Sequence, residues 1–592
     1  MYFLRPVEIH CSYCHNYRYL RRSRPIRLII TLLNNKKHSG GQIMKEIQEL
    51  FPSMDGNDFQ REELLSYFKT ILTKIDELKD PDKLTLGEMP EYTEDYYNRV
   101  IQNANVPQAG VSINEVIKEL LKLVEGHRYV NRNYVANAAP LPNIASIIGN
   151  LVMVLVNGNN LWDVEGPAAA TAEVEITSML SKLIGYDENL SAGYTTWGGQ
   201  GAVFNSLRLA IARYAPSSNL IGIPKNLYCF CSELSHYSLY KSVEAAGIGV
   251  ENMVRVKVNQ DHSMNLEDLK EKIEQVIAKG GVPLYILATM GTTDTFGIDD
   301  IKGIKQLAEE LERRHCLSPL YIHADSAMGG MYTFFNNYDF ERNPLQLAED
   351  VKEVLQSYQQ KFTQIKLADS MVFDFHKLGQ TPYITSLFLV KNRESLKYVD
   401  LDEEETPYVG NRGYGSYHTG YTLECSRMGS ALAIYASLLA FGVEGYQKLL
   451  ANYIRVNSKF RETLTKEIPN AAITNEVSPI TTFRFYPEEP KWIEERNGLL
   501  TAEEMIEINQ FNDAFAEIIG AERDTIFFGN TKKQCLVKAA NSNKQIPVYA
   551  HKFFTISPYS TVEEIDRYVA FLKEHLSFFM KTKPTYDSIS LF

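Results

Sequence analysis

From Leu161 onward, short runs of apolar residues alternate with stretches of helical periodicity, and this alternation limits the folds open to the chain. The runs are 284–289, 320–324, 371–373 and 386–390. Apolar runs of strand length, separated by helix-length segments, predict a mostly parallel sheet covered by helices. A helix is expected to begin at Pro167 and to end at Gly185. We therefore expect an α/β fold.

Changes in this pattern divide the chain into four expected parts. They are a basic leader at 1–43, a helical arm at 44–160, a large α/β domain at 161–442 and a smaller α+β domain at 443–592. The leader has eight Lys or Arg residues and one acid, which gives a net charge of +7. We interpret it as a disordered extension. A targeting segment is the alternative, although the apolar stretch 28–33 is too short for a signal-peptide core.

The charge balance indicates a small-molecule partner. The net charge of the whole chain is 61 − 73 = −12, and nucleic acids and anionic membranes favour surplus Lys and Arg instead. No apolar run reaches the roughly 18 residues that a membrane span needs. The seven cysteines are too few for a disulfide framework, so we expect a reducing, cytoplasmic location. Cys11 and Cys14 have metal-ligand chemistry, but no second ligand pair follows, and we predict no metal site.

Four segments carry residues that suit a planar, phosphorylated and cationic cofactor. Each stands where an apolar run meets a turn or a helix start. They are the glycine-rich turn 195–205 with Gly198, Gly199 and Gln200, the segment 235–240 with His236, the segment 323–327 with Asp325, and the segment 374–380 with His376 and Lys377. The chain lacks the usual phosphate-loop, zinc-protease, nucleophile-elbow and dinucleotide motifs.

Taken singly, each segment also has an ordinary structural explanation, such as a glycine turn, a helix cap or a surface lysine. Glycines at a helix start let a phosphate approach free backbone N–H groups. An acid at the end of a buried strand needs a positive charge beside it, and a desolvated lysine becomes nucleophilic. Together with a ring-stacking imidazole, these groups form a complete site for pyridoxal phosphate.

The order of these motifs resembles the group II pyridoxal-5′-phosphate-dependent amino-acid decarboxylases, which include glutamate, aromatic-amino-acid, histidine and tyrosine decarboxylases. The resemblance covers roughly residues 130–580. Its strongest parts are 157–160, 166–168, 235–238, 288–293, 323–325 and 376–383. It implies the fold type I of pyridoxal phosphate enzymes, similar to aspartate aminotransferase, with pyridoxal 5′-phosphate as cofactor. It also implies a homodimer with its active site at the subunit interface.

By this resemblance, Lys377 forms a Schiff base with the cofactor, Asp325 keeps the pyridine nitrogen protonated and His236 stacks on the ring. The remaining expected cofactor contacts are Gly198, Gly199, Gln200, Thr293 and His376. Arg427 and Asn137 are expected at the substrate, Arg427 because several members carry an arginine there beside the substrate carboxylate. The chain departs from the family at Gln200 and Gly201, where a Ser or Thr and then an acid are common.

Residues 391–421 correspond to the mobile loop with which this family protonates its product. The candidate proton donors in it are Tyr408, Tyr414, Tyr417, His418 and Tyr421. We name Tyr414 as the catalytic one, because its glycine neighbours suit a lid that opens and closes.

We therefore expect a carboxy-lyase that converts an L-amino acid to its amine and CO2 through a Schiff base at Lys377. Another carbon–carbon lyase of the same fold or an aminotransferase is the alternative among enzymes. A pseudoenzyme or scaffold is the alternative of another class, since Gln200 and Gly201 are unusual. Aromatic, acidic and basic amino acids all remain open as substrates.

Overall fold

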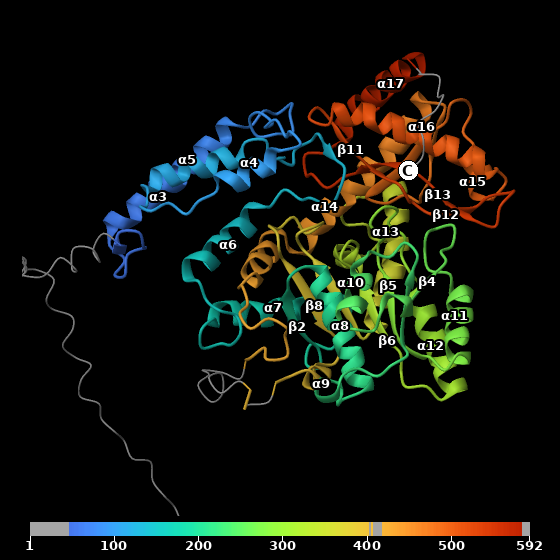
Figure 1. Cartoon of the computed structure of the whole chain (residues 1–592), viewed down its shortest axis with the longest axis horizontal. Helices are drawn as coiled ribbons and strands as arrows, with labels where there is room; N and C mark the ends of the chain where they lie inside the picture. Colours follow the sequence, from blue (N-terminus) through green and yellow to red (C-terminus); the bar gives the residue numbers. More distant parts are fainter. Residues whose placement is uncertain (1–46, 402–403, 406–416, 583–592) are drawn as a thin grey trace, which may run out of the picture. The chain divides into compact units, whose positions relative to one another are not determined.

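The computed structural model describes residues 47–401, 404–405 and 417–582 (Figure 1). The chain forms two compact units. The first consists of residues up to Leu78 together with 91–125, and the second of 79–90 together with the chain from Gly126 onward. The predicted leader and two of the candidate proton donors, Tyr408 and Tyr414, lie outside the described residues.

The first unit is helical. Its helices are α3 (Asp58–Glu77), α4 (Tyr96–Asn103) and α5 (Ile113–Val124). The side chain of Asn57 caps α3 by accepting a hydrogen bond of 3.0 Å from the backbone N–H of Gln60. Ser112 caps α5 in the same way. Such caps satisfy backbone donors that a helix start leaves open.

The second unit is built on a seven-stranded sheet with the strand order β2-β8-β7-β6-β5-β3-β4. The strands are β2 (Ala192–Thr196), β3 (Leu227–Ser232), β4 (Met253–Val256), β5 (Val282–Thr289), β6 (Tyr321–Asp325), β7 (Ser370–Asp374) and β8 (Ser386–Val390). Of these seven strands, β8 alone runs in the direction opposite to the other six. The four predicted apolar runs are β5 to β8, so the prediction of a mostly parallel sheet is confirmed.

Helices cover both faces of this sheet (Figure 1). Ile286 and Ala288 of β5 belong to a core shared with α7 (Pro167–Ile184), α11 (Leu266–Ala278), α12 (Ile301–His315) and α13 (Glu349–Phe362). Leu287 belongs to the core on the opposite face, with α8 (Gly199–Tyr214) and α10 (Ser238–Ala245). A parallel sheet buried on both faces explains why its strands are almost continuously apolar. The predicted helix from Pro167, which ends at Gly185, is confirmed as α7.

A smaller sheet combines an early strand with four strands that follow the long helix α14 (Ala431–Glu467), which bends at Gly442. The φ of Gly442 is +57°, a value that favours glycine. The sheet has the order β1-β11-β14-β10-β9. Its strands are β1 (Tyr134–Val135), β9 (Ala471–Ile473), β10 (Ile480–Phe485), β11 (Phe527–Thr531) and β14 (Ala550–Phe554). Four of these strands lie in the part of the chain, 443–592, for which the sequence predicts an α+β domain.

The second unit contains further helices and one hairpin outside these two sheets. They are α6 (Ile144–Val156), α9 (Ser218–Ile221), α15 (Trp492–Arg496), α16 (Ala502–Ala521), α17 (Ile565–Thr582) and the hairpin of β12 (Leu536–Lys538) and β13 (Gln545–Pro547). Among the described helices, none combines the length and the apolar character that crossing a bilayer requires.

Candidate active site

The four predicted segments meet at one edge of the large sheet. Asp325 and Asp374 are the last residues of the neighbouring parallel strands β6 and β7. Gly199 begins α8 directly after β2, and an ideal Cβ on it would lie 2.9 Å from Oδ2 of Asp374. His236 follows β3. Polar groups at the carboxyl ends of parallel strands are where open α/β sheets bind ligands.

Lys377 is paired with a buried carboxylate. Its Nζ lies 3.0 Å from Oδ2 of Asp374, whose side chain is 2% exposed. Oδ1 of Asp374 accepts a hydrogen bond of 2.5 Å from the hydroxyl of Ser386, and Nε2 of His376 lies 3.7 Å from Oδ2. Burial raises the pKa of Asp374, but Lys377, His376 and Ser386 outweigh it and the pKa falls below its ordinary value. Asp374 is therefore an anion beside the amine.

Asp325 is also a buried carboxylate, but its pKa is raised where that of Asp374 is lowered. It is 6% exposed, and the backbone N–H of Ala327 donates to its Oδ1 at 3.3 Å. Burial raises the pKa of Asp325 to about 6, against the opposing effect of Lys377. It forms no ion pair with a residue of the described ranges. A buried acid of this kind favours a cation at its side, and the protonated ring nitrogen of pyridoxal phosphate fits that need.

His236 presents a neutral ring. The backbone N–H of Ser238 donates to its Nδ1 at 3.2 Å, and its ring centroid lies 4.0 Å from that of Tyr237. Desolvation, followed by the charge of Lys377, lowers the pKa of His236 to about 4. The ring lines a cavity of about 400 Å³ together with Thr293 and Asp294. An uncharged flat ring at this position suits stacking on a cofactor.

The start of α8 explains why the chain departs from the family there. An ideal Cβ on Gly201 would lie 2.9 Å from the ring of Trp197, so a larger residue has no room. The side-chain amide of Gln200 donates to the carbonyl of Ser238 at 3.2 Å and to the hydroxyl of Ser242 at 3.0 Å. Gln200 therefore ties α8 to α10. The backbone N–H groups at the helix start remain suited to a phosphate.

Comparison with known proteins agrees with this geometry. Residues 95–486 match the family described as "Pyridoxal-dependent decarboxylase conserved domain". The chain belongs to this family. The predicted family and the pyridoxal phosphate cofactor are thereby confirmed, and the chain is a member of a family of amino-acid decarboxylases.

Individual relatives of this decarboxylase are distant. An aspartate 1-decarboxylase of Aliivibrio fischeri is 26% identical over 81% of both chains. An aromatic-L-amino-acid decarboxylase of Bacillus atrophaeus is 23% identical over 65% of this chain and 74% of that protein. The crystal structure of an Oryza sativa TDC with PLP and tryptamine superposes with a TM-score of 0.68 at 14% identity, over 90% of this chain and 100% of that chain. The predicted fold type I is confirmed by this likeness.

Arg427 is paired with a buried carboxylate, Glu173, and no contact of Arg427 with Lys377 is found among the described residues. The guanidinium is buried and lies 2.6 Å from Oε1 of Glu173, and it also donates to the carbonyls of Asn160 and Thr195 at 3.1 Å. The hydroxyl of Tyr417, another candidate, donates to the same Glu173. The substrate role of Arg427 stays a prediction. Sequence reasoning missed Glu173, which stands in no recognisable motif.

A second cation, which the sequence did not reveal, is paired with Asp294, a residue that lines the cavity of His236. Lys552, on β14, donates to Oδ1 of Asn137 at 3.0 Å and lies 2.8 Å from Oδ1 of Asp294. Phe553 packs into the core of the small sheet, so the alternation of the strand directs Lys552 to the opposite face. A lysine within a short strand whose residues are all buried is unusual, but the sequence alone does not show that burial.

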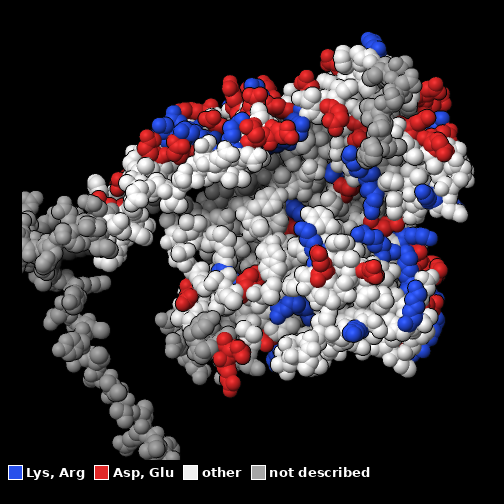
Figure 2. Space-filling view, in the orientation of Figure 1, with Lys and Arg blue, Asp and Glu red and all other residues white. Residues whose placement is uncertain are grey.

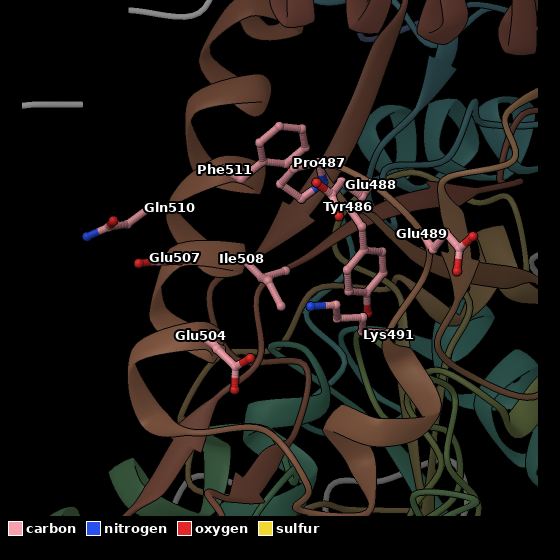
Figure 3. Close-up of a pocket in the computed structure, with 10 residues that line it drawn as sticks. All are labelled: Tyr486, Pro487, Glu488, Glu489, Lys491, Glu504, Glu507, Ile508, Gln510 and Phe511. Atoms are coloured by element: carbon pink, nitrogen blue, oxygen red, sulfur yellow. The ribbon is translucent and has the colours of Figure 1, made fainter. Parts of the chain in front are cut away.

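Another groove, of about 390 Å³, lies between the segment after β10 and helix α16 (Figure 3). Tyr486, Ile508 and Phe511 form its apolar part, and Glu488 and Glu507 lie on its rim. None of the predicted site residues lines it. The candidate active site of the decarboxylase is therefore the edge of the large sheet.

Proposed function

We propose that the chain converts an L-amino acid to the corresponding amine and CO2, with Lys377 as the amine that binds the cofactor aldehyde. The observation that carries this proposal is the position of Lys377, 3.0 Å from the buried anion Asp374. It stands at the same sheet edge as Asp325, a buried acid that forms no ion pair within the described part of the chain.

Pyridoxal phosphate supplies an electron sink for the electron pair that is released when the bond from Cα to the carboxylate breaks. The chain's own residues have separate tasks. Asp325 holds the proton on the ring nitrogen, because a buried carboxylate is stabilised by a cation beside it. His236 offers its neutral face to the ring. Lys377 binds the aldehyde before the reaction and takes it back when the amine leaves.

The phosphate end of the cofactor belongs at the start of α8. Gly198 has a φ of +105°, which favours glycine, and Gly199 leaves room above Asp374 and Ala327. The free N–H groups and the dipole of the helix attract an anion there. Gln200 contributes its backbone, since its side chain is bonded to α10. We also assign His376 and Thr293 to cofactor contacts, and Tyr414 stays the predicted proton donor.

Replacement of Lys377 tests this proposal. Lys377→Ala should lower the release of amine and CO2 to about a thousandth of the wild-type rate or less, because the group that forms the covalent bond is gone. Borohydride reduction of the wild type with pyridoxal phosphate should give a peptide-mass adduct on Lys377. Lys279→Ala, at an exposed lysine that follows α11, is the matched control and should keep its activity.

Undiminished amine and CO2 release by Lys377→Ala would overturn the proposal. A keto acid or an aldehyde as the wild-type product would favour an aminotransferase or another lyase of the same fold. Absence of any adduct with excess cofactor would leave the pseudoenzyme.

We further propose that two copies of the chain form a homodimer through α6. This helix has 13 residues and none is charged, yet Ile144 is 77% and Val154 64% exposed. The surface over α6 is free of charged side chains (Figure 2). Asn143, the N-cap of α6, donates from its backbone N–H to the carbonyl of Gln380 at 2.8 Å. The exposed apolar helix thus begins beside the turn that carries Lys377.

A further inference from the structure

The strand that leads to the proposed phosphate site is the edge of the large sheet. Among the described strands, β2 has a neighbour on one side only, β8. An open strand edge leaves backbone groups that other parts of the chain must satisfy. At Thr195 of β2, the backbone N–H donates at 2.8 Å to Oε1 of Glu173, and the carbonyl accepts at 3.1 Å from Nη2 of Arg427. Two side chains thus take the place of a second neighbouring strand.

The hydroxyl of Thr195 is bonded to the same two side chains. It donates to Oε1 of Glu173 at 2.8 Å and accepts from Nη2 of Arg427 at 3.1 Å. All three polar groups of Thr195 are therefore held by one ion pair, whose side chains are 0% (Glu173) and 2% (Arg427) exposed. Hydrogen bonds in which one partner is charged are stronger than neutral ones. The ion pair therefore holds the end of β2 firmly.

The direction of the ion pair is set by further contacts. Glu173 is on α7, and Nη1 of Arg427 donates at 3.1 Å both to Oε2 of Glu173 and to the carbonyl of Asn160. The hydroxyl of Tyr417 also donates to Oε2 of Glu173. Burial, followed by the charge of Glu173, raises the pKa of Tyr417 well above its ordinary value, so this hydroxyl keeps its proton. The guanidinium is thus held from several sides and directed at β2.

The end of β2 determines where the proposed phosphate site lies. Thr195 stands three residues before Gly198, and the hydroxyl of Thr196 donates to the carbonyl of Gly198 at 3.0 Å. Helix α8 begins at the next residue, Gly199. The N–H groups of a helix start bind a phosphate well only when the surrounding structure holds them in position. A shift of Thr195 would therefore displace these donors together.

We propose that Glu173 and Arg427 are positioning residues for the cofactor phosphate. They act through Thr195, which holds the turn at Gly198 and the start of α8 in the geometry that a phosphate needs. Neither side chain has to touch the cofactor. Arg427, which the sequence places at the substrate, has this task at β2 instead. The inference rests on the proposed function, because that proposal assigns the phosphate to the start of α8.

The test compares two ligands that differ in the phosphate group. Pyridoxal phosphate and pyridoxal are each titrated into the full cofactor-free chain and followed by absorbance, which gives the ratio of their Kd values. The wild type should bind pyridoxal phosphate about a hundredfold more tightly or better, since several charge-assisted hydrogen bonds reach the phosphate. The ratio isolates the phosphate contacts, because a general loss of structure weakens the binding of both ligands.

Glu173→Met with Arg427→Met removes both charges, which a buried site tolerates better than the loss of one. The Kd ratio should fall by about tenfold or more, because Thr195 loses four hydrogen bonds. Arg427→Lys keeps the charge but not the planar fork of donors, and its ratio should lie between the two. Arg484→Met with Glu495→Met is the matched control. This ion pair, at the small sheet, is 0% exposed on both sides, and the ratio should stay within about twofold of the wild type.

An unchanged Kd ratio in the folded double variant at Glu173 and Arg427 would overturn the inference, and so would an equal loss of affinity for both ligands. Where the double variant does not fold, a wild-type ratio in Arg427→Lys has the same meaning. A wild type that binds pyridoxal as tightly as pyridoxal phosphate would also overturn it. A wild type that distinguishes the two ligands but releases CO2 from no amino acid would instead remove the proposed function, which is a distinguishable result.

Discussion

Asp325 and Asp374 are two buried acids on neighbouring strands, and Lys377 is paired with only one of them. The ammonium stabilises the anion of Asp374, whereas burial raises the pKa of Asp325 to about 6. Ionised Asp325 therefore destabilises the chain without cofactor. A residue that lowers stability until its ligand binds is typical of a functional site.

Asp325→Asn should stabilise the cofactor-free chain at pH 8 and weaken its binding of pyridoxal phosphate. The folded pKa of about 6 is above the ordinary 3.8, so the folded state holds this proton more tightly and stability falls as pH rises from about 4 to about 6. Above that range the loss amounts to up to about 3 kcal/mol, at 1.36 kcal/mol per pKa unit. The uncharged amide of the variant avoids this loss of stability.

Urea unfolding of both cofactor-free chains at pH 5 and pH 8 measures this effect. The advantage of Asp325→Asn should be larger at pH 8 than at pH 5. An equal difference in unfolding free energy at the two pH values would contradict the prediction. Titration with pyridoxal phosphate, followed by absorbance, measures the loss of cofactor affinity separately.

Sequence reasoning located residues that stand in a local motif at a strand end, such as Asp325 and Lys377. It could not identify Glu173 or Lys552, because their charges are paired across 254 and 258 residues of chain. Such pairs are produced by tertiary packing. Arg427 is the opposite case. Its motif was recognised in the sequence, but the motif does not indicate that the guanidinium forms an ion pair with the buried Glu173.

Among the elements, α6 differs most from expectation, because its apolar side chains are exposed in the single chain. A helix that is apolar on all sides is usually buried, and the sequence gives no sign that this one is exposed in the single chain. The strands β5 to β8 were predictable because short apolar runs between helical stretches are characteristic of a buried parallel sheet. The exposure of a helix depends on which other element packs against it, and the periodicity of apolar residues in the sequence does not reveal that element.

Charges placed on α6 should dissociate the proposed homodimer. Ile148 and Leu155 are each 54% exposed, so Ile148→Arg with Leu155→Arg should fold but leave guanidinium groups that an apolar interface cannot solvate. Sedimentation should show a dimer for the wild type and a monomer for the double variant. Ile221→Arg, at a residue of α9 that is 82% exposed, is the control and should stay dimeric. A monomeric wild type, or a dimeric double variant, would contradict the proposal.

At the scale of the whole molecule, the order of four motifs was enough to predict the family, the cofactor and the fold type. The substrate was left open because no motif identifies it, and some groups near the candidate site are brought together only by contacts between the two sheets of the second unit. Asn137 follows β1, Asp294 follows β5 and Lys552 is on β14. No single segment of sequence contains this set, so its chemistry becomes visible only when the two sheets are assembled.

The two compact units should respond differently to the cofactor. Pyridoxal phosphate at a concentration of 100 Kd stabilises the part of the chain that binds it by about 2.7 kcal/mol. Hydrogen exchange should therefore slow in 198–201, 323–327 and 374–380, where the phosphate, the ring nitrogen and the aldehyde have their proposed contacts. Helices α3 and α5 should exchange at an unchanged rate, because they belong to the first unit.

Lys377→Ala should show weaker protection of the same segments, since phosphate and ring contacts remain while the covalent bond is lost. Protection centred on α16, which lines the groove in Figure 3, would place the cofactor away from the edge of the large sheet. Equal protection of both units would mean that the first unit also takes part in binding. The exchange pattern thus locates the cofactor without depending on any particular substrate.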